Sequence, residues 1–361
     1  MDQPDSQHEA IRVTIVVACR NEINHIRGFV DSVLAQDFRG LKWEAIVADG
    51  LSDDGTRAVL AEYCADHPQL RVIDNPRRIV SCGLNVAICA ARGEIIIRMD
   101  VHTRYAPDYC ILCLETLESV GADNVGGPAR TTATGIYARA VAAAYHSRFC
   151  TGARFHDEKY EGWVDTVTYG CWHRSTFDRI GLFDENLVRN QDDELNLRLI
   201  RAGGRIWQNP RIMSWYSPRG SLSGLFRQYF QYGFWKVAVI RKHRIPASWR
   251  HVLPLIFIAT NLSLLAAIPL AIWAHAQSAA LTAAILWTAM VGFYAIGNVF
   301  ASALAAHSAG WDIFPYLPTV FATYHFAWGF GFLVGLIRMF GGRPHSSLAF
   351  AGDSRFTRLS R

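Results

Sequence analysis

A long region almost without charge limits what this chain can fold into. Between Val252 and Ile337 the sequence carries one charged side chain, Asp312. The region contains three apolar segments, each long enough for the roughly 20 residues that a helix needs to cross a bilayer. They are Val252 to Trp273, Ser278 to Ala306 and Leu317 to Ile337. A buried helical core is the alternative, but its helices usually run about 10 to 14 residues and keep a polar face. We therefore predict a transmembrane region of about three helices over residues 252–338, which excludes a uniformly soluble protein.

The charge of the remaining chain indicates its compartment. The chain has 36 Lys and Arg against 31 Asp and Glu, and the net charge of +5 is too small to indicate a nucleic-acid partner. Residues 1–11 form a polar tail without the apolar run of a signal peptide. We expect a multi-pass protein of the cytoplasmic (inner) membrane with residues 12–220 in the cytosol, in agreement with the basic run Arg241 to Arg244.

The basic C-terminal tail, residues 339–361, does not fit three crossings. Three spans that start in the cytosol end outside, yet Arg343, Arg355 and Arg361 make this tail basic, as cytosolic tails tend to be. Two interpretations remain open. Either one apolar segment is re-entrant, or the stretch from Ser278 to Ala306 forms two short helices.

Residues 221–251 link the two parts of the chain. The stretch from Ser221 to His243 combines aromatic residues such as Phe226 and Trp235 with basic residues such as Arg227 and Lys236. This composition is typical of an amphipathic helix at the membrane interface, just before the first span. The alternative is a helix that covers a soluble core.

The segment 12–220 shows β-branched runs that alternate with amphipathic stretches. The predicted strand–helix units are Val13–Ala18 with Ile23–Gln36, Ala45–Asp49 with Ser52–Cys64, Leu70–Asn75 with Val80–Ala91, and Glu94–Asp100 with Pro107–Val120. A further strand is predicted over Val164–Tyr169. This order indicates an α/β domain with a mostly parallel, Rossmann-like sheet and helices on both faces. The dinucleotide and Walker fingerprints are both missing from the sequence.

Ligands of such sheets bind outside the carboxyl ends of the strands. The polar residues at those ends are Arg20, Asn21, Glu22, Asp49, Arg77, Arg78, Asp100 and His102. Acids, a histidine and cations together suit a metal ion and a diphosphate. Asp100 and His102 suit Mn²⁺ or Mg²⁺, or else Asp100 caps the following helix and His102 is only exposed.

Three consecutive acids, Asp192 to Glu194, begin a further predicted helix. Favourable interaction with the helix dipole explains them as well as a catalytic base does.

The eight cysteines are scattered, which indicates free thiols in a reducing compartment. Cys110 and Cys113 have zinc-like spacing, but packing on one apolar helix face is the favoured interpretation.

At this point the chain resembles the family 2 glycosyltransferases, which have the nucleotide-sugar-binding GT-A fold. The resemblance rests on segments in the family's order over about 200 residues: Ile15–Glu22, Ile46–Thr56, Gly83–Asn85 with Ala91–Glu94, Asp100–His102 at the family's DXD position, and Gln191–Leu195. The sequence is most similar to the branch that contains the succinoglycan-biosynthesis glucosyltransferases.

The resemblance implies a role for each matching residue. Asp49 would contact the nucleotide base, Glu22 the ribose, and Asp100 with His102 the metal ion, while Asp192 matches the catalytic aspartate. The donor-binding residues that we expect are Ala18, Arg20, Glu22, Asp49, Arg77, Arg78, Asn85 and Asp100. His102 replaces the second acid of DXD, but histidine still binds Mn²⁺. Gln191 replaces the usual Glu, which removes a negative charge beside Asp192 and alters the tuning of its pKa.

The resemblance also implies an inverting enzyme. It would move one hexose, glucose or a relative, from a UDP-sugar to a polyprenyl-linked saccharide in exopolysaccharide biosynthesis. Asp192 would act as general base, and the metal ion with Arg77 or Arg78 would stabilise the leaving group. Tyr169 and Trp172 either stack on a sugar or pack in the core.

Sequence features argue against three rival functions. A processive synthase of this family carries Gln-x-x-Arg-Trp, whereas Gln228 to Tyr232 lacks the Arg and Trp. A non-catalytic sugar-nucleotide-binding scaffold would have lost acids that this chain keeps. A transporter would need polar groups in its spans, and Asn261, Asn298 and His325 are more simply explained by helix packing.

Overall fold

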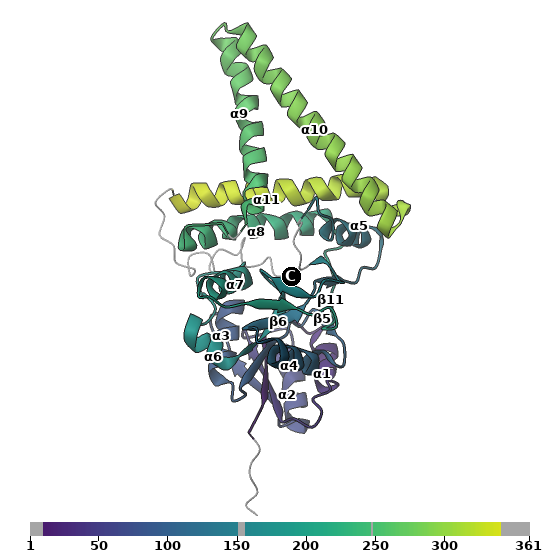
Figure 1. Cartoon of the computed structure of the whole chain (residues 1–361), viewed down its shortest axis with the longest axis vertical. Helices are drawn as coiled ribbons and strands as arrows, with labels where there is room; N and C mark the ends of the chain where they lie inside the picture. Colours follow the sequence, from purple (N-terminus) through teal and green to yellow (C-terminus); the bar gives the residue numbers. More distant parts are fainter. Residues whose placement is uncertain (1–9, 151–155, 247, 341–361) are drawn as a thin grey trace, which may run out of the picture. The chain divides into compact units, whose positions relative to one another are not determined.

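The computed structural model describes residues 10–150, 156–246 and 248–340, which form two compact units (Figure 1). The first unit contains residues 10–131 and 156–217, and the second contains 132–150 and 218–340. The sequence-based boundary at residue 220 lies next to the observed one. The segment 132–150, which we expected in the first part, groups with the C-terminal part instead.

In the first unit, eight of the described strands form one mixed sheet in the order β3-β2-β1-β4-β9-β6-β10-β8. The strands are β1 (Val13–Cys19), β2 (Trp43–Asp49), β3 (Leu70–Asp74), β4 (Ile95–Arg98), β6 (Asn124–Gly127), β8 (Gly162–Val164), β9 (Thr168–His173) and β10 (Ile206–Gln208). The first four run parallel to one another, as the alternating pattern predicted. β9 runs antiparallel to both β4 and β6.

The strand predicted over Val164–Tyr169 is wrong in its position. The structure has one short strand that ends at Val164 and a second that starts at Thr168. The exposed Asp165 lies between them, while Cys171 and Trp172 further along are fully buried. Burial of these side chains between β4 and β6 moves the strand toward His173.

Helices cover both faces of this sheet, as predicted. They are α1 (Ile26–Leu34), α2 (Thr56–Asp66), α3 (Val80–Ala90), α4 (Tyr109–Val120), α6 (Arg174–Ile180) and α7 (Gln191–Arg201). Alternate residues of β1 point to opposite faces: Ile15 and Val17 pack with α1 and α4, and Val16 packs with α3. Cys110 and Cys113 lie buried in the first of these cores, which supports the packing interpretation.

A small second sheet in the same unit has the order β5-β11-β7. It comprises β5 (Thr103–Tyr105), β7 (Arg130–Thr131) and β11 (Ser214–Tyr216). β5 directly follows Asp100 and His102. The second sheet therefore fixes the end of the loop that carries these two residues.

The second unit is helical. It contains α5 (Ile136–Tyr145), α8 (Leu222–His243), the 3₁₀ turns η2 (Trp249–His251) and η3 (Trp311–Tyr316), and the long helices α9 (Leu253–Trp273), α10 (Gln277–Ala309) and α11 (Leu317–Phe340). Three stretches are long and apolar enough to cross a membrane: Trp249–Trp273, Gln277–Ala309 and Trp311–Met339. α10 is one continuous helix, so the interpretation of its segment as two short helices is wrong. No proline interrupts it, and its alanine-rich sequence favours a long helix.

Candidate active site

Two loops at the carboxyl edge of the sheet are joined by side-chain hydrogen bonds. The Asn21 side chain donates to Asp53 at 2.9 Å and accepts the Asp53 backbone N–H at 3.0 Å. The backbone N–H of Glu22 donates to the Thr56 hydroxyl at 2.8 Å. Asn21 itself is in the left-handed region, at φ 57°, which an asparagine tolerates well. The loop after β1 is therefore held by the loop after β2, and Glu22 has a fixed backbone.

Asp49 is fully buried at the end of β2, opposite Cys19 of β1. Its carboxylate accepts hydrogen bonds from the backbone N–H and hydroxyl of Ser52, and from Arg57 at 3.2 Å. It thus shapes the turn that leads to α2. Whether it also contacts a nucleotide base stays a prediction.

Some of the predicted donor residues lie where α3 packs closely against β1. A Cβ atom on Gly83 would lie 3.0 Å from the Cβ of Ala18, so only glycine lets α3 approach β1 this closely. Arg20 is exposed, and its aliphatic stem packs over Gly50. Arg78 is also exposed, with a left-handed φ of 58°.

Asn85 and Arg77 contact the loop that precedes α7. The Asn85 side chain accepts the Phe183 backbone N–H and donates to the Phe183 carbonyl, both at 2.9 Å, and donates to Glu185 at 3.1 Å. Arg77 forms an ion pair with Glu185. These contacts fix the loop that leads to Asp192 at the start of α7. Donor binding by Asn85 and Arg77 stays a prediction.

Two of the three acids at the start of α7 have different environments. Glu194 is fully buried and pairs through both oxygens with Arg198, one turn later, at 2.7 and 3.1 Å. Asp192 forms an ion pair with Arg98 of β4, and its side chain is 40% exposed. Glu194 therefore has a structural partner, while Asp192 is positioned at the carboxyl edge with access to solvent.

Arg98 was not predicted as a site residue, and it sets the electrostatics of Asp192. Its side chain is 7% exposed, and its guanidinium lies 5.8 Å from the Tyr169 ring centre and 5.9 Å from that of Phe183. Desolvation raises the pKa of Asp192 above its usual value, while Arg98 acts in the opposite direction. A raised pKa suits a general base. The signal in the sequence was an arginine at the end of an otherwise apolar strand, because a buried charge needs a partner.

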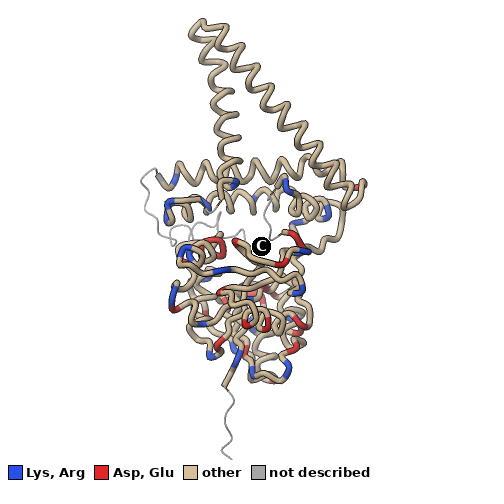
Figure 2. The backbone as a smooth tube through the Cα atoms, viewed as in Figure 1, with Lys and Arg blue, Asp and Glu red and all other residues tan. Residues whose placement is uncertain are grey.

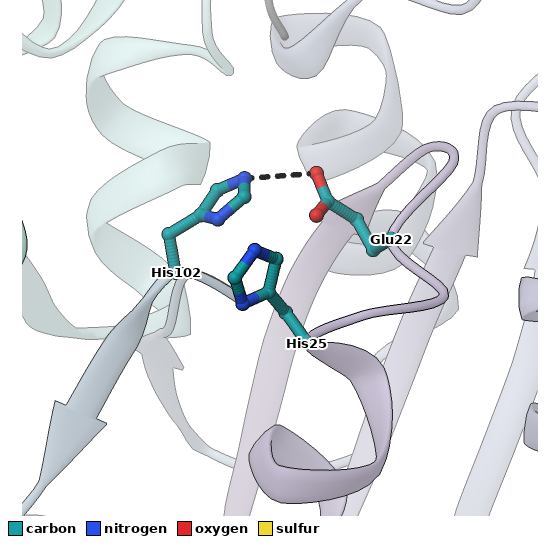
Figure 3. Close-up of side chains that lie close together, drawn as sticks. All are labelled: Glu22, His25 and His102. Carbon is teal, nitrogen blue, oxygen red and sulfur yellow. Dashed lines mark hydrogen bonds and ion pairs between the residues drawn. The ribbon is translucent and has the colours of Figure 1, made fainter. Parts of the chain in front are cut away.

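A second group of side chains joins the loops after β1 and β4 (Figure 3). His102 Nε2 lies 2.9 Å from Glu22 Oε1, and the ring centres of His25 and His102 are 4.7 Å apart. One potential ligand atom from each of the three lies within 4.8 Å of the others. Asp100 starts the same loop, where its carboxylate accepts the His102 backbone N–H at 3.0 Å. His25 was missed, although its position three residues after Glu22 at a helix start was a usable signal.

Trp172 does not belong to this site. It is 1% exposed and packs against Phe177 and Phe183, so the stacking interpretation is wrong for Trp172 and the core interpretation holds. Tyr169 lies closer to the site, because its hydroxyl hydrogen-bonds Thr103 and its ring faces Arg98.

Comparisons with known proteins place the chain in a family. The family model described as glycosyl transferase family 2 matches residues 14–181. The succinoglycan biosynthesis protein ExoA of Rhizobium meliloti (strain 1021) is 32% identical over 272 residues, which are 73% of this chain and 82% of the relative. A dolichyl N-acetyl-alpha-D-glucosaminyl phosphate 3-beta-D-2,3-diacetamido-2,3-dideoxy-beta-D-glucuronosyltransferase of Methanococcus voltae is 26% identical over 245 residues, 66% of this chain and 76% of the relative.

Among solved structures, a mannosyltransferase from Pyrobaculum calidifontis, PcManGT in complex with GDP-Man and Mn²⁺, aligns with a TM-score of 0.56. The identity is 21%, over 92% of this chain and 89% of that chain, so the likeness concerns the fold. The first unit therefore has the GT-A-like fold of glycosyltransferases, as predicted. The chain belongs to the family 2 glycosyltransferases, and it is an enzyme of that class.

Proposed function

We propose that the chain moves a single hexose, glucose or a close relative, from a UDP-sugar to a polyprenyl-linked saccharide in exopolysaccharide biosynthesis. The single observation that carries the catalytic part is the Arg98–Asp192 pair, which holds one solvent-accessible carboxylate at the carboxyl edge of the sheet. The names of the relatives support the pathway and the acceptor, since one belongs to succinoglycan biosynthesis and another acts on a dolichyl-linked sugar. The apolar helices support action at a membrane, and the basic run Arg241 to Arg244 supports the cytosolic face of the cytoplasmic membrane.

The proposed reaction is a direct displacement. Asp192 accepts the proton of the acceptor hydroxyl while that oxygen attacks the anomeric carbon of the donor. The bond from this carbon to the nucleotide diphosphate breaks, and its electron pair leaves with the diphosphate. A single displacement inverts the anomeric centre, so an α-linked donor gives a β-linked product. Arg77 and Arg78 are the two candidates for stabilising the diphosphate leaving group. Arg77 is already paired with Glu185, whereas Arg78 is exposed.

The residues beside the site fit a divalent cation. The two imidazoles and the Glu22 carboxylate of the group in Figure 3 form the mixed nitrogen and oxygen donor set that Mn²⁺ accepts, and Asp100, which starts the same loop as His102, adds a carboxylate that also suits Mg²⁺. We propose that Asp100 and His102 hold the ion. Bound there, Mn²⁺ or Mg²⁺ would neutralise charge on the diphosphate leaving group.

Metal binding is measured on the purified full-length chain by the loss of the free Mn²⁺ signal in electron paramagnetic resonance. We expect Asp100→Ala to weaken Mn²⁺ binding at least about tenfold, because it removes a ligand. Asp178→Ala, on the exposed side of α6, is the matched control and should bind as the unchanged protein does. His25→Ala tests whether the group in Figure 3 contributes. Equal Mn²⁺ affinity in Asp100→Ala and the control would contradict the assignment.

Donor and acceptor are identified together in membranes that contain the chain. Each membrane sample receives one labelled nucleotide sugar, and the label that enters the lipid extract is counted. We expect transfer from a UDP-hexose. Transfer from a GDP-sugar instead would overturn the donor assignment, and label that grows into long polymer without added enzymes would overturn single-sugar transfer.

A further inference from the structure

We infer that α11 does not cross the bilayer but lies with α8 as a pair of parallel helices on its cytosolic surface, leaving the α9–α10 hairpin as the only span-forming part of the described chain. The inference goes beyond the proposed function, because it concerns how the chain is anchored and not what it transfers. Every contact that supports it lies within the second unit.

α8 and α11 pack against each other along their length (Figure 1). The Tyr229 and Tyr324 rings lie 4.3 Å apart near the start of the two helices, and Arg241 donates to the Met339 carbonyl at 3.0 Å near their ends. The contacts advance in the same direction along both helices, so the pair is parallel.

Glycines bring the two backbones of this pair together. A Cβ atom on Gly233 of α8 would lie 2.1 Å from the Trp328 carbonyl oxygen, and one on Gly331 of α11 would lie 2.0 Å from that of Phe230. Gly335 repeats the close approach one turn later, at 2.8 Å from the Phe234 carbonyl oxygen. Such close packing means that α8 and α11 share one position relative to the membrane.

The charges of α8 argue against a position inside the bilayer. Arg227 lies more than one turn from the start of α8 and is exposed, and Arg241 and Lys242 occupy the last turn. Lys236 in the middle of α8 is buried, with its amine 5.8 Å from the centre of the Trp328 ring of α11. Lysine and arginine in the middle of a spanning helix are costly, while an aromatic and basic helix suits the interface. Because α11 packs along α8, it stays at the interface with it.

The apolar composition of α11 is explained by packing against protein. Of the 18 most apolar consecutive residues in Trp311–Met339, which includes α11, 44% are buried within the described chain. The corresponding share is 6% for Trp249–Trp273, which includes α9, and 11% for α10. Phe321 and Tyr324 are buried, and the Tyr324 hydroxyl donates to the Val141 carbonyl of α5 at 3.2 Å. Protein therefore covers much of the apolar surface of α11, and a helix at the interface can turn the remainder toward the bilayer.

The α9–α10 hairpin has the opposite properties. The helices run antiparallel, with the Phe257 and Tyr294 rings 4.7 Å apart and Trp287 donating to Asn261 at 3.1 Å. Neither helix contains a charged residue, as Figure 2 shows. The 21 residues of α9 span about 31 Å, close to the roughly 30 Å of a hydrocarbon core.

A two-span anchor also accounts for the charge of the C-terminal tail. Two crossings return the chain to the side on which it started, so residues 341–361 lie on the same side as residues 12–220. Arg343, Arg355 and Arg361 then agree with the positive-inside rule. The conflict noted from the sequence disappears.

Protease protection of the full-length chain tests the inference. One epitope tag is placed after Arg361, a second in the turn at His275 between α9 and α10, and a third at Met1 as the reference for the cytosolic side. Protease is added to spheroplasts, where it reaches outer segments, and to inverted membrane vesicles, where it reaches cytosolic ones.

We expect the C-terminal and N-terminal tags to be cleaved only in inverted vesicles, and the His275 tag only in spheroplasts. Cleavage of the C-terminal tag in spheroplasts would show that α11 crosses and would overturn the inference. Cleavage of all three tags in inverted vesicles alone would overturn it too, since the hairpin would not cross. Transfer activity is not the readout, so failure of the proposed function leaves this test intact.

Discussion

Replacing Arg98 should shift the pH dependence of catalysis. If Asp192 is the base, kcat/KM is lost as the pH falls through the pKa of Asp192, because the protonated acid cannot accept the acceptor proton. Arg98 lowers that pKa by pairing with the carboxylate. Arg98→Gln removes the cation but keeps a polar side chain, so the pKa of Asp192 rises and activity is lost at a higher pH.

The size of the shift follows from the exposure of the pair. A neighbouring arginine lowers the pKa of an aspartate by about 1 to 3 units. The Asp192 side chain is 40% exposed, so solvent screens part of the interaction and the lower end of that range applies. We expect the acid limb of the kcat/KM profile to move up by about one pH unit.

The assay is the initial rate of label transfer at low donor concentration, across a pH series in which each variant is shown to stay folded. Arg98→Lys keeps the charge and should keep the acid limb close to its original position. Arg130→Gln is a matched control, because Arg130 is also mostly buried but pairs with Glu158 outside the site. An unchanged acid limb in folded Arg98→Gln, or an equal shift in Arg130→Gln, would refute the reasoning.

Two further predictions concern the stability of the first unit. Glu44 is fully buried, and although burial raises its pKa, hydrogen bonds from Arg92, Arg71 and Thr14 lower it overall. Its stabilisation is therefore present above the unfolded-state pKa and is lost as the pH falls through the folded-state pKa. Arg92 and Arg71 are partly exposed, so Glu44→Gln leaves no buried unpaired cation; it should reduce the free energy of unfolding by about 1 to 2 kcal/mol at pH 7 and flatten the loss of Tm below about pH 4, measured by thermal denaturation. Asn85→Ala should cost about 2 to 3 kcal/mol in the same assay, since the Phe183 backbone groups lose their partner. A stable Asn85→Ala variant with lost donor binding would instead assign Asn85 to the donor.

Local periodicity was enough to predict the α/β part of the fold. The strands Val13–Cys19 and Trp43–Asp49 are continuous buried runs, and their polar ends stand where the sheet topology requires. The strand around Trp172 was misplaced, because its pairing between β4 and β6 depends on segments distant in sequence. The grouping of residues 132–150 with the C-terminal helices has the same cause, since α5 packs against η3 and α11.

The candidate site was predicted in part. Its acids stand at strand ends and helix starts, which a sequence pattern reveals. Arg98 lies within the predicted strand Glu94–Asp100 and was given no role in the site, because its pairing with Asp192 joins residues far apart in the chain. Composition also cannot separate an apolar helix that faces lipid from one that packs on protein, so our inference about α11 rests on its contacts with α8. The glycines Gly331 and Gly335, four residues apart, were the available signal of close packing.

Transfer by Asp192→Asn tests the central claim most directly. Membranes with this variant receive the labelled donor and the lipid-linked acceptor, and donor binding is measured in parallel. The account predicts a rate lower by a factor of about 10² to 10⁴ with donor affinity within a few-fold, because the amide cannot accept the proton. Asp193→Asn, about 100° further around α7, should retain most of the rate. Transfer by Asp192→Asn at the rate of Asp193→Asn would contradict the account, as would loss of donor binding in Asp192→Asn alone.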